Sequence, residues 1–154
     1  MNGALKPIDP AGHPALSGVL APVDDELSVT DLPVVGRIPD DLRGVYLRNG
    51  PNPKFPPLGS YTYPLDGDGM IHGVWLEDGK ARYRNRYVLT KGLAAEIRAG
   101  RALWGGIMTP AAPPPELAGP DPDPGGDKVL ADINIVRHAH RFLALGEGVA
   151  PYEV

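Results

Sequence analysis

The clearest fold signal in the sequence is Met70–Thr90, MIHGVWLEDGKARYRNRYVLT. Two β-prone runs flank Asp78-Gly79, a dipeptide that readily adopts the positive φ angles of a tight hairpin turn. Because side chains alternate across a strand, the tyrosines of the second run share one face. Its three arginines share the other face: Arg82, Arg84 and Arg86. The stretch predicts a β-hairpin with a packed tyrosine face and a solvated arginine face.

Weaker strand signals lie on both sides of this hairpin. Gly44–Arg48 predicts a short strand, which we expect to end in a rigid loop at 49–53, Asn-Gly-Pro-Asn-Pro. Near the end of the chain, 132–136 and 142–147 predict two strands joined across a turn at 137–140. The sequence therefore predicts two hairpins and several isolated strands.

A single helix is expected, at Leu93–Ala99, with Gly100 as the residue that ends it. The composition agrees with a helix-poor protein, because 20 glycines and 19 prolines occur among 154 residues. Such a fraction breaks helices and excludes a helical bundle, a coiled coil or a long α-solenoid. With 42% apolar residues the chain can still bury a core. We therefore expect an all-β protein.

Charge and cysteine content narrow the function classes. The net charge of −4 argues against nucleic acid or an anionic membrane as the main partner. The absence of cysteine removes disulfides, thiolate nucleophiles and cysteine-based zinc sites. No stretch has the pattern of a leader peptide or a transmembrane segment, so a cytoplasmic location is expected and peripheral membrane contact is left open.

The chain divides into an arm and a β-rich part. Residues 1–19 hold three prolines and little periodicity, which predicts an extended N-terminal arm. Residues 20–154 carry the strand signals. Within them, 109–128 is an acidic, proline-rich stretch that predicts an inserted surface loop.

Two sequence motifs suggest metal sites, but each of them is weak evidence for a bound metal. Asp66-Gly67-Asp68 suggests a calcium loop, but the later ligand and glycine positions of such a loop are occupied by apolar residues. His138 and His140 could bind a metal together with Glu147, although the turn expected at 137–140 removes their shared orientation. Packing or surface roles are the simpler interpretation of both motifs. Two further histidines, His13 in the arm and His72 in the first hairpin, are expected to be non-ligands.

Four blocks of sequence carry a resemblance to a known family. They are GRIPDDLRGVYLRNGPNPKF (36–55), YPLDGDGMIHGVWLEDGKARYRNRYVLT (63–90), GRALWGG (100–106) and NIVRHAHRFLALGEGVAPYEV (134–154). Together, and in this order, they resemble the N-terminal part of the carotenoid cleavage oxygenase family, also called the retinal pigment epithelial membrane protein family. The blocks cover most of the chain outside the arm and the proline-rich loop.

The resemblance implies a fold and a chemistry. Members of this family are seven-bladed β-propellers, so the chain would be an incomplete, N-terminal part of such a propeller. They hold one Fe(II) through four histidines and use O₂ to cleave a C=C bond of a carotenoid, an apocarotenoid or a stilbene. An iron site with neutral ligands leaves positions open for O₂.

The resemblance also assigns residues. In the family the first iron histidine follows the block that ends this chain, so all four iron ligands would lie beyond Val154 and none of the four histidines present would be one. Glu147 matches a glutamate that accepts a hydrogen bond from an iron-bound imidazole. The position before it, Gly146, faces the substrate and is tryptophan or lysine in other branches. His140 stands where the family has glycine, and a positive φ there would cost about 1 kcal/mol.

The function expected from all of this is the N-terminal portion of an iron(II)-dependent carotenoid or apocarotenoid dioxygenase. The chain alone would be inactive and would bind no iron, because it supplies Glu147 but no iron ligand. The alternative is a non-catalytic β module that binds an apolar ligand or another protein chain. A metal site of His138, His140 and Glu147 is the third possibility.

Overall fold

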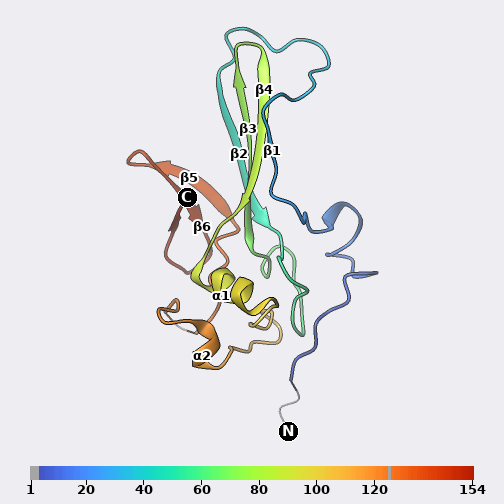
Figure 1. The fold of residues 1–154 in the computed structure, drawn as a ribbon, viewed down its shortest axis with the longest axis vertical. Coiled ribbons are helices and arrows are strands. Elements are labelled where there is room, and N and C mark those ends of the chain that lie inside the picture. Colours follow the sequence, from blue (N-terminus) through green and yellow to red (C-terminus); the bar gives the residue numbers. More distant parts are fainter. Residues whose placement is uncertain (1–3, 125) are drawn as a thin grey trace.

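Two antiparallel β-sheets make up most of the regular structure (Figure 1). The computed structural model describes residues 4–124 and 126–154. The larger sheet has the strand order β1-β4-β3-β2, with β1 at Ser28–Val29, β2 at Gly44–Pro51, β3 at Gly69–Glu77 and β4 at Lys80–Tyr87. The smaller sheet has the order β5-β6-β7, with β5 at Asn134–His138, β6 at Arg141–Leu145 and β7 at Tyr152–Glu153. The expected mostly β, antiparallel architecture is confirmed.

The first hairpin forms as predicted. Strands β3 and β4 pair antiparallel up to Glu77 and Lys80, and the turn residues Asp78 and Gly79 have φ angles of 50° and 72°. Asn85 is fully buried on the tyrosine face, whereas Arg82 lies in solvent. The alternation of a packed and a solvated face is therefore confirmed.

Strand β2 is longer than the sequence suggested. It continues through Asn49 and Gly50 to Pro51, which pairs with Gly69. The predicted rigid loop is thus wrong for its first three residues. The physical reason is that β2 lies at the edge of its sheet. Proline has no N–H, and at an edge strand this costs no hydrogen bond to a neighbouring strand.

The turn of the second hairpin is shorter than predicted. We expected a four-residue turn at 137–140, but Arg137 and His138 belong to β5 and only Ala139 and His140 form the turn. Their φ angles are 47° and 65°. His140 therefore adopts the left-handed conformation that favours glycine, at a cost of about 1 kcal/mol.

Helix α1 spans Lys91–Ala99 and matches the expected helix closely. The Oγ1 atom of Thr90 accepts a hydrogen bond from the backbone N–H of Leu93, and Gly100 ends the helix with a φ of 67°. The expectation of a single helix is wrong, because a 3₁₀ turn lies at Gly18–Leu20 and a short helix, α2, at Pro115–Ala118. None of these helices in the described part is long and apolar enough to cross a membrane.

The proline-rich stretch 109–128 is docked rather than loose. The hydroxyl of Tyr152 donates a hydrogen bond to Asp123 over 2.7 Å, and the indole N–H of Trp104 donates to the carbonyl of Gly126 over 3.0 Å. The described part of the N-terminal arm also makes contacts, because the N–H of Ile8 donates to the carbonyl of Pro57 over 2.7 Å. Both segments thus cover the lower half of the molecule.

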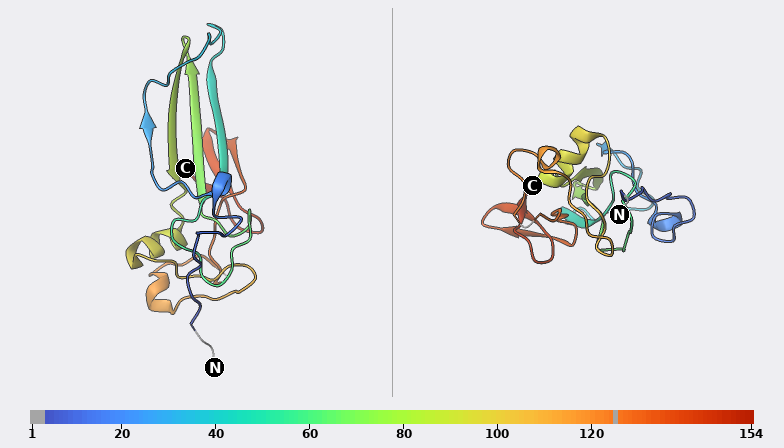
Figure 2. Two further views of the ribbon diagram at one scale, coloured as in Figure 1. Left: turned by 90° about the vertical axis from the view of Figure 1, so that its right-hand side faces the viewer. Right: turned by 90° about the horizontal axis from the view of Figure 1, so that it is seen from below.

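The two sheets meet where the side-chain amide of Asn49 in β2 donates to the carbonyl of Asn134 in β5 over 3.0 Å, and at one short segment, 129–131. Its Val129 and Ala131 pack with Val88 and Ala144 in a buried cluster. The carbonyl of Leu130 accepts the N–H of Gly69, which joins the segment to the start of β3. Figure 2 shows the larger sheet projecting away from this junction, with the helices and long loops gathered below it.

Candidate functional site

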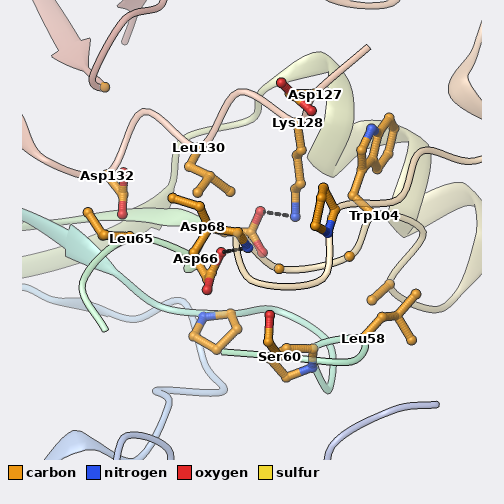
Figure 3. A pocket seen from close by; sticks show the side chains of 18 of the residues that line it. Leu58, Ser60, Leu65, Asp66, Asp68, Trp104, Asp127, Lys128, Leu130 and Asp132 are labelled. Atoms are coloured by element: carbon orange, nitrogen blue, oxygen red, sulfur yellow. Dashed lines mark hydrogen bonds and ion pairs between the residues drawn. The ribbon is translucent and has the colours of Figure 1, made fainter. Parts of the chain in front are cut away.

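A cavity of about 500 Å³ lies beside the junction of the two sheets, and Figure 3 shows part of its wall. Its wall is built from four stretches of chain and one helical residue, Glu96 of α1. The stretches are 53–68, 102–111, 127–133 and 146–149. Residues far apart in the sequence therefore face one space beside the junction of the two sheets.

Apolar side chains contribute much of the wall. They include Phe55, Leu58, Leu65, Trp104, Ile107 and Ile133. Leu65 is 37% exposed, Ile107 56% and Ile133 39%, although all three line the cavity. The apolar part of the wall is thus reachable from solvent and can accept a hydrophobic molecule.

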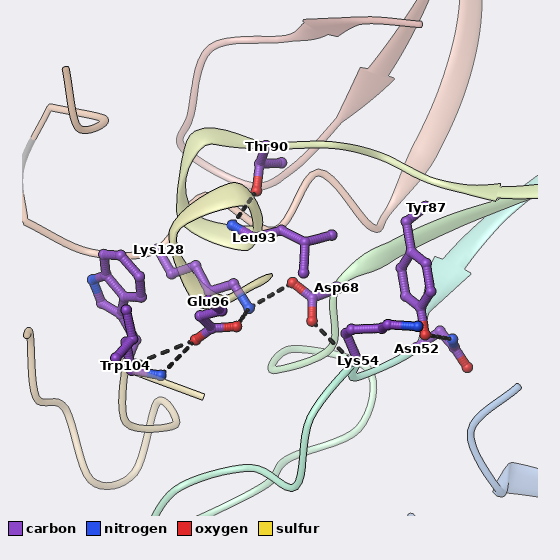
Figure 4. Close-up of polar contacts among 10 residues, drawn as sticks. Asn52, Lys54, Asp68, Tyr87, Thr90, Leu93, Glu96, Trp104 and Lys128 are labelled. Carbon is purple, nitrogen blue, oxygen red and sulfur yellow. Dashed lines mark hydrogen bonds and ion pairs between the residues drawn. The ribbon is translucent and has the colours of Figure 1, made fainter. Parts of the chain in front are cut away.

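A buried ion cluster forms another part of the wall (Figure 4). The Nζ atom of Lys128 lies 2.5 Å from Oδ1 of Asp68 and 2.6 Å from Oε2 of Glu96. The exposed fractions of these three side chains are only 12%, 4% and 2%. Burial lowers the pKa of Lys128, but the two carboxylates outweigh it, so the pKa is raised above its ordinary value. The ammonium group therefore stays charged and ties α1 to the start of β3.

The remaining oxygens of this cluster also have partners. Oε1 of Glu96 accepts the backbone N–H of Leu103 over 2.8 Å. Oδ2 of Asp68 accepts the backbone N–H of Lys54 over 3.0 Å. Both oxygens of each carboxylate therefore have partners within the protein, and these contacts stabilise the fold.

Both carboxylate oxygens of Asp66 also have hydrogen-bond partners. Its Oδ2 accepts the N–H of Thr62, and its Oδ1 accepts the N–H of Ile107, both over 2.6 Å. The two carboxylates of the Asp66-Gly67-Asp68 motif therefore serve main-chain and lysine contacts, which matches the packing role that we preferred for this turn.

Three other carboxylates line the wall, those of Asp127, Asp132 and Glu147, and none of them pairs with another described side chain. Asp132 is only 3% exposed, and its Oδ2 has no hydrogen-bond partner within the described residues. Burial raises its pKa to about 7, helped by the negative charges of Asp68, Asp66 and Glu147. Glu147 lies in the turn that follows β6 and is exposed. Together with the exposed Asp127, these two acids give the cavity free acceptor groups.

The predicted site residues Gly146 and Glu147 both line this cavity. Gly146 is closely packed: a Cβ atom there would lie 2.9 Å from Cγ2 of Val149 and 3.3 Å from the backbone N of Ala131. A tryptophan or lysine at this position would require these neighbours to move.

The four histidines do not gather at the cavity. His72 lies in β3, where its Nδ1 is hydrogen-bonded to the hydroxyl of Tyr83 over 2.8 Å, and burial, together with Arg48, lowers its pKa. His138 and His140 are exposed at the end of the second hairpin. No group of three or more His, Cys, Asp or Glu side chains in the described ranges could hold a metal. The residues present therefore do not fit an iron site, and the third possibility of a site at His138, His140 and Glu147 gains no support.

Sequence reasoning missed Asp132, Lys128 and Glu96. Lys128 and Glu96 are 32 residues apart, so no local motif joins them. Asp132 is a lone acid before a strand, which is a common arrangement. Only its burial beside other acids distinguishes it.

Comparison with known proteins gives a family match over most of the chain. The model of the retinal pigment epithelial membrane protein family matches residues 20–154. A carotenoid cleavage oxygenase of Mycobacterium tuberculosis is 44% identical over 144 residues, which cover 92% of this chain and 26% of the relative. The carotenoid 9,10(9′,10′)-cleavage dioxygenase 1 of Pisum sativum is 40% identical over 154 residues, covering 92% of this chain and 28% of the relative.

Two solved structures are also similar to this chain over most of its length. A lignostilbene dioxygenase of Pseudomonas brassicacearum is similar with a TM-score of 0.80 and 30% identity, over 92% of this chain and 28% of that protein. A variant of the Synechocystis apocarotenoid oxygenase has a TM-score of 0.70 and 29% identity, over 86% and 28%. The chain spans about a quarter of the length of these relatives.

Proposed function

Because this chain belongs to the retinal pigment epithelial membrane protein family, we propose that it forms the N-terminal portion of an oxygenase that cleaves C=C bonds of carotenoids or apocarotenoids with Fe(II) and O₂. Stilbenes are a further substrate class, since a lignostilbene dioxygenase is among the similar structures. In this proposal the two sheets are parts of a seven-bladed propeller, preceded by an arm at 1–19.

The observation that carries the proposal is the position of Glu147. It stands on the wall of a cavity that is also lined by several apolar side chains, beside the closely packed Gly146. A polyene offers only hydrocarbon to its enzyme, and an apolar wall accepts it while excluding water. A carboxylate at the edge of that wall can accept an imidazole N–H and so fix the orientation of a metal-binding histidine. The described residues supply no set of iron ligands, so none of them is assigned to bind iron.

A chimeric enzyme tests this function. This chain would replace the matching 144 residues of the Mycobacterium tuberculosis carotenoid cleavage oxygenase. We expect oxygen-dependent loss of polyene absorbance and the appearance of carbonyl products. A folded chimera that binds carotenoid without cleaving it would instead favour the alternative, a non-catalytic module that binds apolar ligands.

Glu147→Gln in this chimera is expected to lower kcat and iron occupancy by about 10- to 100-fold. The amide keeps the size of the side chain but loses the charge that makes it a strong acceptor for an imidazole N–H. Turnover and bound iron would be measured on the same samples. The matched control is Glu153→Gln, an exposed glutamate that makes a surface ion pair with Arg141. Equal effects of the two substitutions would contradict the role of Glu147.

A further inference from the structure

An extended segment, residues 23–29, lies along the β4 edge of the larger sheet and is held there by buried side-chain amides. Oδ1 of Asn85 accepts the N–H of Leu27 over 2.6 Å. Asn52 holds Val23 from both sides, because its Oδ1 accepts the N–H over 2.6 Å and its Nδ2 donates to the carbonyl over 2.9 Å. The two asparagines are 0% and 5% exposed. We call this segment the strap, and these contacts fix its position on the sheet.

Two arginines of β4 converge on one hydroxyl of the strap. Ser28 is directly opposite Arg84 in the pairing of β1 with β4, so the two side chains lie on the same face. Nη2 of Arg86 donates to Oγ of Ser28 over 2.8 Å, and Nε of Arg84 donates to it over 3.4 Å. Nη1 of Arg86 also donates to the carbonyls of Leu27 and Asn85, which holds the guanidinium in this orientation. A neutral oxygen therefore accepts from two positively charged side chains.

The positive charge on this face lacks a matching negative charge. Among the described residues, none of the ion pairs involves Arg82, Arg84 or Arg86, although the chain as a whole carries a net charge of −4. A hydrogen bond between a guanidinium and an anion is roughly twice as strong as one between neutral groups. An anionic group on the oxygen of Ser28 would therefore make better use of the oriented arginines than the hydroxyl does.

Ser28 is also accessible and has a distinctive sequence context. It is exposed, and β1 is a strand of two residues at the edge of its sheet (Figure 1). The three residues at 24–26 are Asp, Asp and Glu, and Asp31 follows three positions after the serine. Protein kinases select their substrates in part by the pattern of charge around the acceptor hydroxyl. This pattern suits a serine kinase whose substrate groove is positively charged.

We propose that Ser28 is a phosphorylation site and that Arg84 and Arg86 bind its phosphate. In the transfer, Oγ of Ser28 forms a bond to the γ-phosphorus of a nucleoside triphosphate. The bond from that phosphorus to the bridging oxygen breaks, the nucleoside diphosphate leaves, and the hydroxyl proton passes to the kinase. The phosphate then accepts charge-assisted hydrogen bonds from both guanidinium groups. Because the serine belongs to the strap and the arginines belong to β4, the modification fastens the strap to the sheet.

This site goes beyond the proposed oxygenase function. Ser28, Arg84 and Arg86 are not among the residues that line the cavity. A failure of the phosphorylation experiments below would therefore leave the proposed function untouched, and a failure of the oxygenase assay would leave the phosphorylation site untouched.

Phosphoserine built into position 28 of the 154-residue chain tests the contact with the arginines. Hydrogen exchange of the backbone amides at 23–29 would be compared with that of the unmodified chain by mass spectrometry. We expect exchange to slow by about tenfold, because the phosphate adds charge-assisted hydrogen bonds between the strap and β4. Phosphoserine at position 17 is the control, because the hydroxyl of Ser17 donates to the carbonyl of His13 instead of accepting from an arginine. It should leave exchange of the strap unchanged.

Substitutions in β4 locate the effect. The slowing caused by phosphoserine at position 28 would be measured within each variant, so that any effect of the substitution on the unmodified chain cancels. Arg86→Gln should remove most of the slowing. Arg82→Gln, an exposed position on the same face, should retain it. No slowing in the unsubstituted chain, or equal slowing in the two variants, would overturn the proposal.

A kinase reaction tests whether the hydroxyl is an acceptor. The folded chain would be incubated with ATP and a purified serine/threonine kinase that selects acidic substrates, and the modified residues would be located by tandem mass spectrometry. We expect phosphate at Ser28, its loss in Ser28→Ala and its retention in Ser17→Ala. Phosphate at other positions with none at Ser28, or no phosphate at all, would overturn the assignment of Ser28.

Discussion

Replacing Lys128 by methionine is expected to lower the free energy of unfolding by about 3–5 kcal/mol. Methionine keeps the length and apolar character of the side-chain stem, which packs against Gly92 of α1. It removes the positive charge that is paired with both Asp68 and Glu96, which are 4% and 2% exposed. Two buried carboxylates would then face each other without compensation, and that penalty exceeds the loss of the pair itself.

Urea unfolding followed by circular dichroism would measure this effect. The matched control is Lys91→Met, because the ion pair of Lys91 with Asp121 lies at the surface, where the exposed fraction of Asp121 is 82%. Exposed ion pairs contribute little, so the control should unfold at nearly the same urea concentration as the unsubstituted chain. If Lys128→Met were no more destabilising than Lys91→Met, the buried cluster would not hold α1 to the sheet.

The second large effect concerns the pH dependence of stability. The pKa of Asp132 is about 7 in the folded chain and near its ordinary value of 3.8 when unfolded. The folded state therefore holds this proton more tightly, so the contribution of Asp132 to stability is fully present below pH 4 and is lost as the pH rises through 7. Asp132→Asn removes this loss. We expect the variant to match the unsubstituted chain at pH 4 and to exceed it by about 2 kcal/mol at pH 8, a value reduced for water that enters the cavity.

Unfolding curves recorded from pH 4 to pH 8 would show this as a divergence between the two proteins. Asp127→Asn removes the same charge from an exposed position on the same cavity and should leave the pH profile unchanged. A variant at position 132 that is less stable than the parent at pH 8 would mean that the carboxylate has a favourable partner in the folded chain.

Much of the fold follows from local chemistry. The Asp78-Gly79 turn and the Thr90 and Gly100 caps of α1 are decided by a few adjacent residues, and these elements were predictable. The second hairpin was harder, because Ala139 and His140 take positive φ angles that neither residue favours. Tertiary pairing with β6 overrides the local preference there. The extension of β2 to Pro51 likewise depends on its place at the sheet edge, which no local pattern reveals.

The site was predictable only in part. Resemblance to a family identified Glu147 and Gly146, and both do line the cavity. Lys128 and Asp132 flank the segment 129–131 that joins the two sheets, so their surroundings come from α1, from the turn before β3 and from the turn after β6. The burial and charge of these residues are properties of the assembled chain. The sequence around each of them is unremarkable.

The most direct test of the proposed function is the iron content of the purified 154-residue chain after anaerobic loading with Fe(II) and desalting, with circular dichroism on the same sample. Since His13, His72, His138 and His140 do not gather at the cavity, the proposal predicts a folded, β-rich spectrum and far less than one iron per chain. About one iron per folded chain would contradict it, because the chain would then build an iron site from its own histidines.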